Sequence, residues 1–309
     1  VSRTEYSDEL KALGAIAGMS RRELHNGQAE MLRRQLAQQR GNWRAVLPHA
    51  LANRLAKRTL QNISPEDINA ELFKRENLRL LQSCAHRLGY LHDFAPAREL
   101  ALSWVRQGAP LGNIATCSDQ HLAVLYHVAP VFPDVMLRAI EDAAVDPAFT
   151  SRRNQNFSRF VRILCHLAYE DDTFDRATAV LLKFAETEKA GENNNSIVGQ
   201  LQQLFSLHLS GTEATPARRQ AFLRSLINSN NPRHREIAGE LLKSALRAHH
   251  WTRFGPFHFG ARKRGAGWRP QTSEEVNAWY VGFIRLLQPT LESTQMCERD
   301  WAKSVLASH

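Results

Sequence analysis

Apolar residues recur every three or four positions along most of the chain, which is the spacing of an amphipathic helix. Two successive stripes of this kind are separated by the acidic run 170–172. Their members are Ile163, Leu164, Leu167 and Ala168 in the first stripe, and Ala177, Val180, Leu181 and Phe184 in the second. Alternating patterns typical of strands are scarce. The pattern therefore predicts an all-α fold.

The predicted helices follow one another in pairs at a regular distance. The second helices of successive pairs are predicted to begin near Phe94, Pro133, Phe174 and Pro216, at intervals of 39, 41 and 42 residues. This spacing favours a HEAT/TPR-like helical repeat array, in which each unit buries its apolar face only against its neighbours. Segments 64–67 and 272–275 place Ser or Thr ahead of carboxylates, which predicts a helix start at each.

The first 62 residues differ from these repeats. Helices are predicted over 5–17, 21–26 and 28–36, and two short strands around Gly41-Asn42 predict a hairpin, Ala37–Leu47. Pro48 then opens a helix over 50–60. This order is that of a small winged-helix-like subdomain. The predicted domains are 1–62 for this subdomain, 63–250 for the repeat array, and 251–309 for a basic aromatic loop with C-terminal helices.

The segment Trp251–Pro270 breaks the helical pattern. It contains four Gly, five aromatic residues, five Lys or Arg and no acid. Its glycines and two prolines exclude a regular helix, and a loop of this length in a compact protein is usually functional or disordered. The aromatic content favours an ordered loop.

The charge of +9 suggests an anionic partner. Met31–Pro65 and Leu241–Ser273 each carry seven Lys or Arg and no acid, so the basic character is local. No apolar stretch approaches the roughly 20 residues of a membrane helix, and no secretory signal pattern is present. The four cysteines lie far apart, which excludes a paired-cysteine zinc motif. We expect a cytoplasmic protein without a metal site.

Catalytic motifs are absent from the sequence. Neither GxxxxGK[ST], GxGxxG, GxSxG nor HExxH occurs. The thirteen histidines show no metal-ligand spacing. We therefore expect this chain not to be an enzyme by itself.

Two groups of residues are candidates for binding. His49 stands at the hairpin-to-helix junction with Arg40, Arg44 and Arg54 nearby in the sequence, a setting that suits a phosphate or another anion. A histidine that only caps the turn is the alternative. The second group suits a nucleic-acid backbone or an acidic protein surface, unless its aromatic residues fold inward. It consists of Arg262, Lys263, Arg264, Trp268 and Arg269.

Several strings resemble the region that follows the nucleotide-binding module in bacterial STAND-type P-loop NTPases. They are QQRGNWRA (38–45), LPHALANRLAKRTL (47–60), RLGYLHD (87–93), LSGTEATPARR (209–219) and FGARKRGAGWRP (259–270). In that family a winged-helix domain packs on the NTPase, and helical repeats beyond it recognise a ligand or partner. The resemblance places His49 where a winged-helix histidine of related ATPases meets the nucleotide β-phosphate, although the triplet here is Leu-Pro-His instead of Met-His-Asp.

The resemblance implies a non-catalytic sensor or scaffold portion of a STAND-type ATPase, which binds a protein partner or ligand and acts in bacterial anti-phage defence. This chain would hold no cofactor itself; ATP or ADP would belong to an upstream NTPase. The alternative is a nucleic-acid-binding winged-helix or helical-repeat protein, which the two basic segments favour. A third class, similar to the HEAT-like alkylpurine DNA glycosylases, fits the six Trp and the net charge, but no residue group specifies it.

Overall fold

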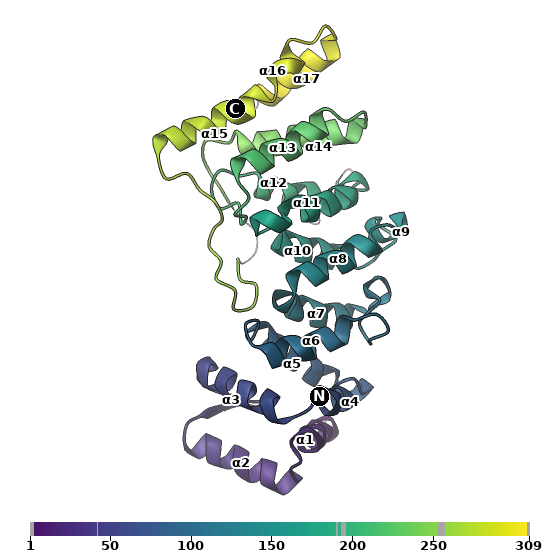
Figure 1. Cartoon of the computed structure of the whole chain (residues 1–309), viewed down its shortest axis with the longest axis vertical. Coiled ribbons are helices and arrows are strands. Elements are labelled where there is room, and N and C mark those ends of the chain that lie inside the picture. Colours follow the sequence, from purple (N-terminus) through teal and green to yellow (C-terminus); the bar gives the residue numbers. More distant parts are fainter. Residues whose placement is uncertain (1–2, 42, 190, 193–195, 253–256, 308–309) are drawn as a thin grey trace. The chain divides into compact units, whose positions relative to one another are not determined.

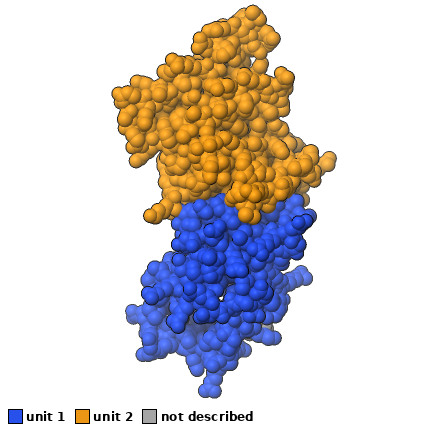
Figure 2. Space-filling model, viewed as in Figure 1, with its two compact units in different colours: residues 1–133, 259–262 blue, residues 134–258, 263–309 orange. Residues whose placement is uncertain are grey.

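The computed structural model describes residues 3–41, 43–189, 191–192, 196–252 and 257–307. These residues form seventeen α-helices, three short 3-10 helices and one two-stranded sheet, which confirms the predicted all-α class. The chain divides into two compact units (Figure 2). Unit 1 comprises Val1–Pro133 and Phe259–Arg262, and unit 2 comprises Asp134–His258 and Lys263–His309. The predicted boundaries at 62 and 250 stay a prediction.

Unit 1 consists of helices and one hairpin. In chain order its elements are α1 (Arg3–Ala17), α2 (Arg21–Arg33), β1 (Ala37–Arg40), β2 (Trp43–Val46), α3 (His49–Asn62), α4 (Pro65–Leu72), η1 (Arg75–Asn77), α5 (Leu78–Gly89), α6 (Ala95–Val105), η2 (Ile114–Thr116), α7 (Asp119–Val128) and η3 (Ala129–Val131).

The N-terminal elements largely follow the sequence pattern. Strands β1 and β2 pair antiparallel, from Ala37 opposite Val46 to Arg40 opposite Trp43, which confirms the hairpin. Gly41 has a φ of +57°, a conformation that glycine adopts at little cost, whereas Asn42 of the predicted turn lies outside the described residues. The predicted break after Asn26 is wrong, because α2 continues through Gly27. Two helices, not three, therefore precede the hairpin.

The core of unit 1 lies around α5, which packs against α6 and α7. Leu81, Leu88 and Leu125 are at most 1% exposed. Trp104 of α6 is fully buried, and its indole N–H donates to Asn69 Oδ1 at 2.7 Å. The largest side chain of this core thus keeps its hydrogen bond. By contrast, α2 has no buried residue over Arg21–Arg33, and α3 buries only Ala52.

Unit 2 consists of helices joined by loops. In chain order its helices are α8 (Pro133–Ala143), α9 (Pro147–Thr150), α10 (Phe157–Leu167), α11 (Asp171–Glu186), α12 (Ile197–Leu204), α13 (Pro216–Ile227), α14 (Pro232–Ala245), α15 (Ser273–Arg285), α16 (Gln288–Leu291) and α17 (Met296–Leu306).

Helices of unit 2 pack in layers, each on the next (Figure 1). The two stripes predicted from the sequence lie on α10 with its C-cap residue Ala168 and on α11, and all eight of their members are buried. Helices α10 and α11 pack on each other. Helix α11 also packs on α12, α12 on α14, and α14 on α17. Helix α13, predicted as the second member of a pair with the preceding helix, packs instead against α14 and α15.

Candidate functional site

His49 lies exposed in the first turn of α3 in unit 1. Pro48 stands at the N-cap and supplies no side-chain hydrogen bond to this turn. The pKa of His86 in α5 is lowered mainly by partial desolvation of its ring, then by the charges of Arg87 and His49. One turn beyond His49, Asn53 of α3 accepts a hydrogen bond from Arg87 of α5. The N-terminal half of α3 therefore lies beside the C-terminal half of α5, a relation that the sequence does not reveal.

Further contacts join α3 to α5 and to the loop after it. Arg87 Nη1 donates to Asn53 Oδ1 at 2.5 Å. Lys57 Nζ lies 3.5 Å from Asp93 Oδ1 and 5.4 Å from the centroid of the Phe94 ring. Positions 49, 53 and 57 are four residues apart, so one face of α3 makes all these contacts.

Three rings gather at the end of α5 next to this face. His86 meets Tyr90 at a centroid distance of 5.1 Å and His127 of α7 at 4.9 Å, in edge-to-face geometry. Tyr90 is 39% exposed, and His86 is exposed as well. We call this region the α3–α5 surface. It is made up of His49, Asn53, Lys57, His86, Arg87, Tyr90 and His127.

Two histidines on this surface, and a third close to it, have lowered pKa values. The pKa of His127 is lowered by burial and by His86. The pKa of His92, close by, is lowered first by burial and then by the charges of Arg262 and Lys57, against an opposing effect of Asp93. These imidazoles are therefore neutral near pH 7, when they offer rings and hydrogen bonds but no charge.

Lowered histidine pKa values make unit 1 sensitive to acid. As pH falls below the ordinary value of 6.5, the unfolded chain binds protons before the folded unit does, so the stabilisation that is present at higher pH is lost. We expect the melting temperature of unit 1 to fall between about pH 7.5 and about pH 5.5. The double variant His86→Gln/His127→Gln should show a smaller fall in melting temperature over this pH range. Thermal unfolding followed by circular dichroism measures it. A variant at the exposed His25 serves as control, and an unchanged fall in the double variant would contradict the assignment.

The hairpin carries two of the predicted arginines. Arg40 is exposed at the end of β1. Arg44 of β2 is also exposed, but its guanidinium is bound by Gln28 and by Gln39 Oε1, the latter at 3.2 Å. Both lie in unit 1 with His49, whereas the second predicted group lies largely in unit 2.

The second group is divided between exposed and inward-facing side chains. Residues 253–256 of the predicted loop lie outside the described residues. Arg262 Nε donates to the Pro130 carbonyl at 2.7 Å within unit 1. Lys263 and Arg269 are exposed, so they can reach a partner.

Arg264 and Trp268 are held inside unit 2. The Arg264 side chain is only 1% exposed, and its guanidinium donates to the His166 carbonyl at 2.7 Å and to Glu170 Oε1 at 3.3 Å. It also lies 4.4 Å from the centroid of the Tyr169 ring. Trp268 stacks on Trp279, with 5.5 Å between centroids. Their partner-binding role stays a prediction, but these contacts already occupy both side chains.

A buried arginine that the sequence analysis missed lies beneath this stack. Arg219 of α13 has no exposed surface and lies 5.2 Å from the Trp279 centroid and 5.8 Å from that of Trp268. Burial lowers the pKa of its guanidinium to about 9, so it is still charged at neutral pH. The sequence contains a signal for this burial, because the spacing of Arg219, Leu223 and Leu226 places the arginine on the apolar face of the helix. Its contacts stabilise the fold and leave no group free for a ligand.

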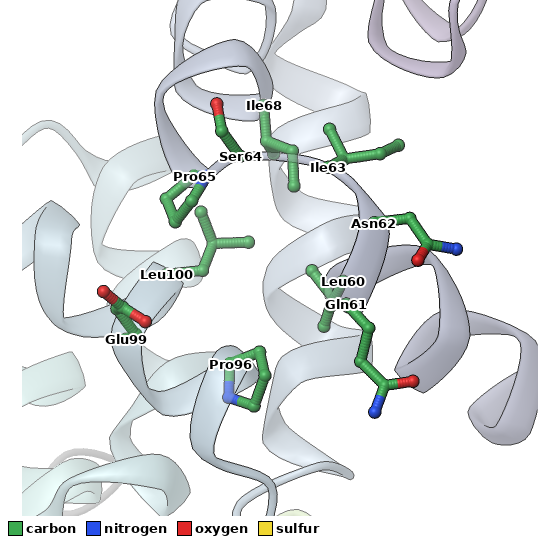
Figure 3. A pocket seen from close by; sticks show the side chains of 10 residues that line it. All are labelled: Leu60, Gln61, Asn62, Ile63, Ser64, Pro65, Ile68, Pro96, Glu99 and Leu100. Carbon is green, nitrogen blue, oxygen red and sulfur yellow. The ribbon is translucent and has the colours of Figure 1, made fainter.

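A cleft of about 420 Å³ lies in unit 1 where α3, α4 and α6 meet. Leu100 and Ile68 lie toward its middle, with Glu99 and Asn62 at opposite sides (Figure 3). Glu99 is the single ionisable residue in its lining. Acid–base catalysis usually uses a second titratable group or a metal, and the lining residues offer no second titratable side chain beside Glu99.

No group of three or more His, Cys, Asp or Glu among the described residues is arranged to hold a metal ion. None of their helices is both long and apolar enough to cross a membrane. Burial raises the pKa of the Cys84 thiol to about 12, which keeps this cysteine protonated and unreactive.

Comparisons with protein-family models, with curated proteins and with solved structures give no match to this chain.

Proposed function

We propose that this chain is the non-catalytic sensor or scaffold portion of a STAND-type ATPase, where it binds a protein partner or ligand. The observation that carries this proposal is the layered packing of α10, α11, α12 and α14, in which each helix hides its apolar stripe on the next. Helices packed in this way leave their outer faces and loops for recognition. The resemblance to the region after the STAND nucleotide-binding module adds the ATPase setting and suggests anti-phage defence.

In this proposal the helix pairs α5/α6 and α10/α11 are units of a HEAT/TPR-like array. Residues 1–62 are a winged-helix-like subdomain in which the hairpin β1–β2 is the wing. Two helices before the hairpin depart from the usual three, and α3 follows the wing directly. What supports the assignment is the position of an exposed histidine, His49, immediately after the wing.

His49 is the proposed contact between this subdomain and the nucleotide. An imidazole at the start of α3, next to the backbone N–H groups of the first turn, suits the β-phosphate of ADP. An upstream NTPase would supply the rest of the nucleotide site. Ligand binding to the array would then shift the subdomain and release the NTPase.

The proposal gives an expected result for ATP turnover. The isolated chain should release phosphate from ATP no faster than buffer, whereas a protein extended upstream should contain a GxxxxGK[ST] motif and hydrolyse ATP. In that extended protein, His49→Ala should speed ADP release by about tenfold, the effect of losing one charge-assisted hydrogen bond. Release of a fluorescent ADP analogue measures this rate.

The exposed His25 of α2 provides the matched control, because His25→Ala removes an imidazole from the same unit but not from α3. Its ADP release should equal that of the unaltered protein. Turnover by the isolated chain, or an upstream reading frame without a phosphate loop, would overturn the proposal.

A further inference from the structure

We propose that the α3–α5 surface of unit 1 binds single-stranded nucleic acid, with phosphates on the cations of α3 and bases on the rings at the end of α5. This inference goes beyond the proposed function and does not depend on it. It rests on three observations: an acid-free run of exposed cations, a cluster of accessible rings beside them, and the contacts that hold the two together.

The cations come from the segment 31–65, which has seven Lys or Arg and no acid. Arg54 and Arg58 of α3 are both exposed and stand four residues apart, one position around the helix from Asn53 and Lys57. Two guanidinium groups on one edge of a helix, about 6 Å apart along its axis, can contact successive phosphates of one strand.

The rings lie at the end of α5, next to the neighbouring face of α3 that carries Asn53 and Lys57. Tyr90 is 39% exposed, and it contacts the exposed His86, which contacts His127. Aromatic side chains next to a basic track are the usual platform for unpaired bases, since every base has a flat face that can stack. Neutral imidazoles add hydrogen-bond donors and acceptors for base edges.

The contacts between the two parts fix their spacing. The Arg87–Asn53 hydrogen bond and the Lys57–Asp93 ion pair hold α3 against the end of α5. Asp93, in the loop after α5, carries a negative charge next to the cations of α3, and its ion pair with Lys57 offsets that charge. The phosphates would thus contact the cations of α3 while the bases stack on the rings. Only a single strand has bases that are free to stack in this way.

A duplex fits this arrangement less well. Its bases are stacked and paired inside the helix, where Tyr90 and His86 at the end of α5 could not reach their faces without opening the pairs. The exposed rings therefore favour a single strand over a duplex, although the cations alone would attract either.

The test measures fluorescence anisotropy of a labelled oligo(dT) or oligo(U) of about 20 nucleotides, long enough for one site, with the full chain at roughly 50 mM salt. We expect binding that weakens steeply as salt rises. Arg54→Ala/Arg58→Ala should weaken it roughly tenfold and lower the salt slope by about 1.4, the value for two lost phosphate contacts on a single strand. Tyr90→Ala should weaken it roughly tenfold with the slope unchanged.

Controls separate this site from general charge and from misfolding. Arg162→Ala/Arg224→Ala removes the same charge from two exposed arginines of unit 2 and should leave the affinity within about twofold. Tyr90→Phe keeps the ring and should bind like the unaltered chain. Circular dichroism verifies that each variant keeps its helices.

Three outcomes would overturn the proposal: no binding of either oligonucleotide at low salt, equal loss in the control pair, or a duplex of the same length that binds as tightly as the single strand while Tyr90→Ala weakens neither. None of them bears on ATP turnover, so failure here leaves the proposed function untouched. Conversely, ATP turnover by the isolated chain would leave this binding intact.

Discussion

Replacing Arg219 with alanine is expected to lower the free energy of unfolding of unit 2 by about 3–5 kcal/mol. The guanidinium is fully buried and lies against the stacked indoles of Trp268 and Trp279. Its removal leaves a cavity beside both rings and takes one donor away from each of four buried acceptors. They are the carbonyls of Ser206, Thr212 and Ala214 and the hydroxyl of Ser210.

The neighbouring arginine supplies the control. Arg218 forms ion pairs with Asp171 and Asp175 at the surface. Arg218→Ala should therefore lower the free energy of unfolding far less than Arg219→Ala does, because exposed ion pairs contribute little to stability. Urea unfolding followed by tryptophan fluorescence compares the two variants. Arg219→Lys should be intermediate, because one ammonium cannot replace the planar fork of donors. Equal effects of the two alanine variants would show that burial of Arg219 does not matter.

Gly267→Ala should be the second strongly destabilising change, by about 2–4 kcal/mol. Gly267 has a φ of +92°, which strains any other residue. A Cβ there would stand 2.5 Å from both the N and the O of Thr212, and these are backbone atoms that cannot move aside alone. The two flanking hydrogen bonds, Gly211 N to Ala266 O at 2.8 Å and Trp268 N to Thr212 O at 2.7 Å, would be pushed apart.

Gly265 provides a control two residues away. A Cβ at Gly265 meets no atom within 4 Å, and its N–H still donates to Tyr169 Oη at 2.8 Å. Gly265→Ala should change the free energy of unfolding by less than about 1 kcal/mol. Differential scanning calorimetry distinguishes the variants. If both melt together, the close contact with Thr212 is not what requires glycine at 267.

Much of the helical framework could be predicted from local signals. The stripes of α10 and α11 are buried as their spacing indicates. Ser64 and Thr272 accept hydrogen bonds from the backbone N–H groups of Asp67 and Glu275, so both predicted helix starts are confirmed. These features depend on neighbours a few residues apart, and such neighbours can be read from a single sequence.

Other features depend on partners distant in the chain. Within KRG, residues 263–265, the sequence does not show that Lys263 faces outward while Arg264 reaches the end of α10. The α3–α5 surface is invisible for the same reason, because His49, His86 and His127 come from three helices. The low helix propensity of glycine also led to a wrong prediction at Gly27. Glycine costs about 1 kcal/mol within a helix, yet α2 continues through it.

The segment from Arg264 to Trp268 has no regular secondary structure, and its conformation is set by the helices and loop it touches. Tyr169 receives the hydrogen bond from Gly265, Thr212 pairs with Trp268, and Arg219 lies against the Trp268 ring. A substitution in this segment therefore changes which side chains fit at the helix and loop positions that it contacts, and the reverse also holds. Among descendants of this sequence, positions 169, 212, 219 and 268 should consequently evolve together as one co-varying group, although up to 99 residues separate them along the chain.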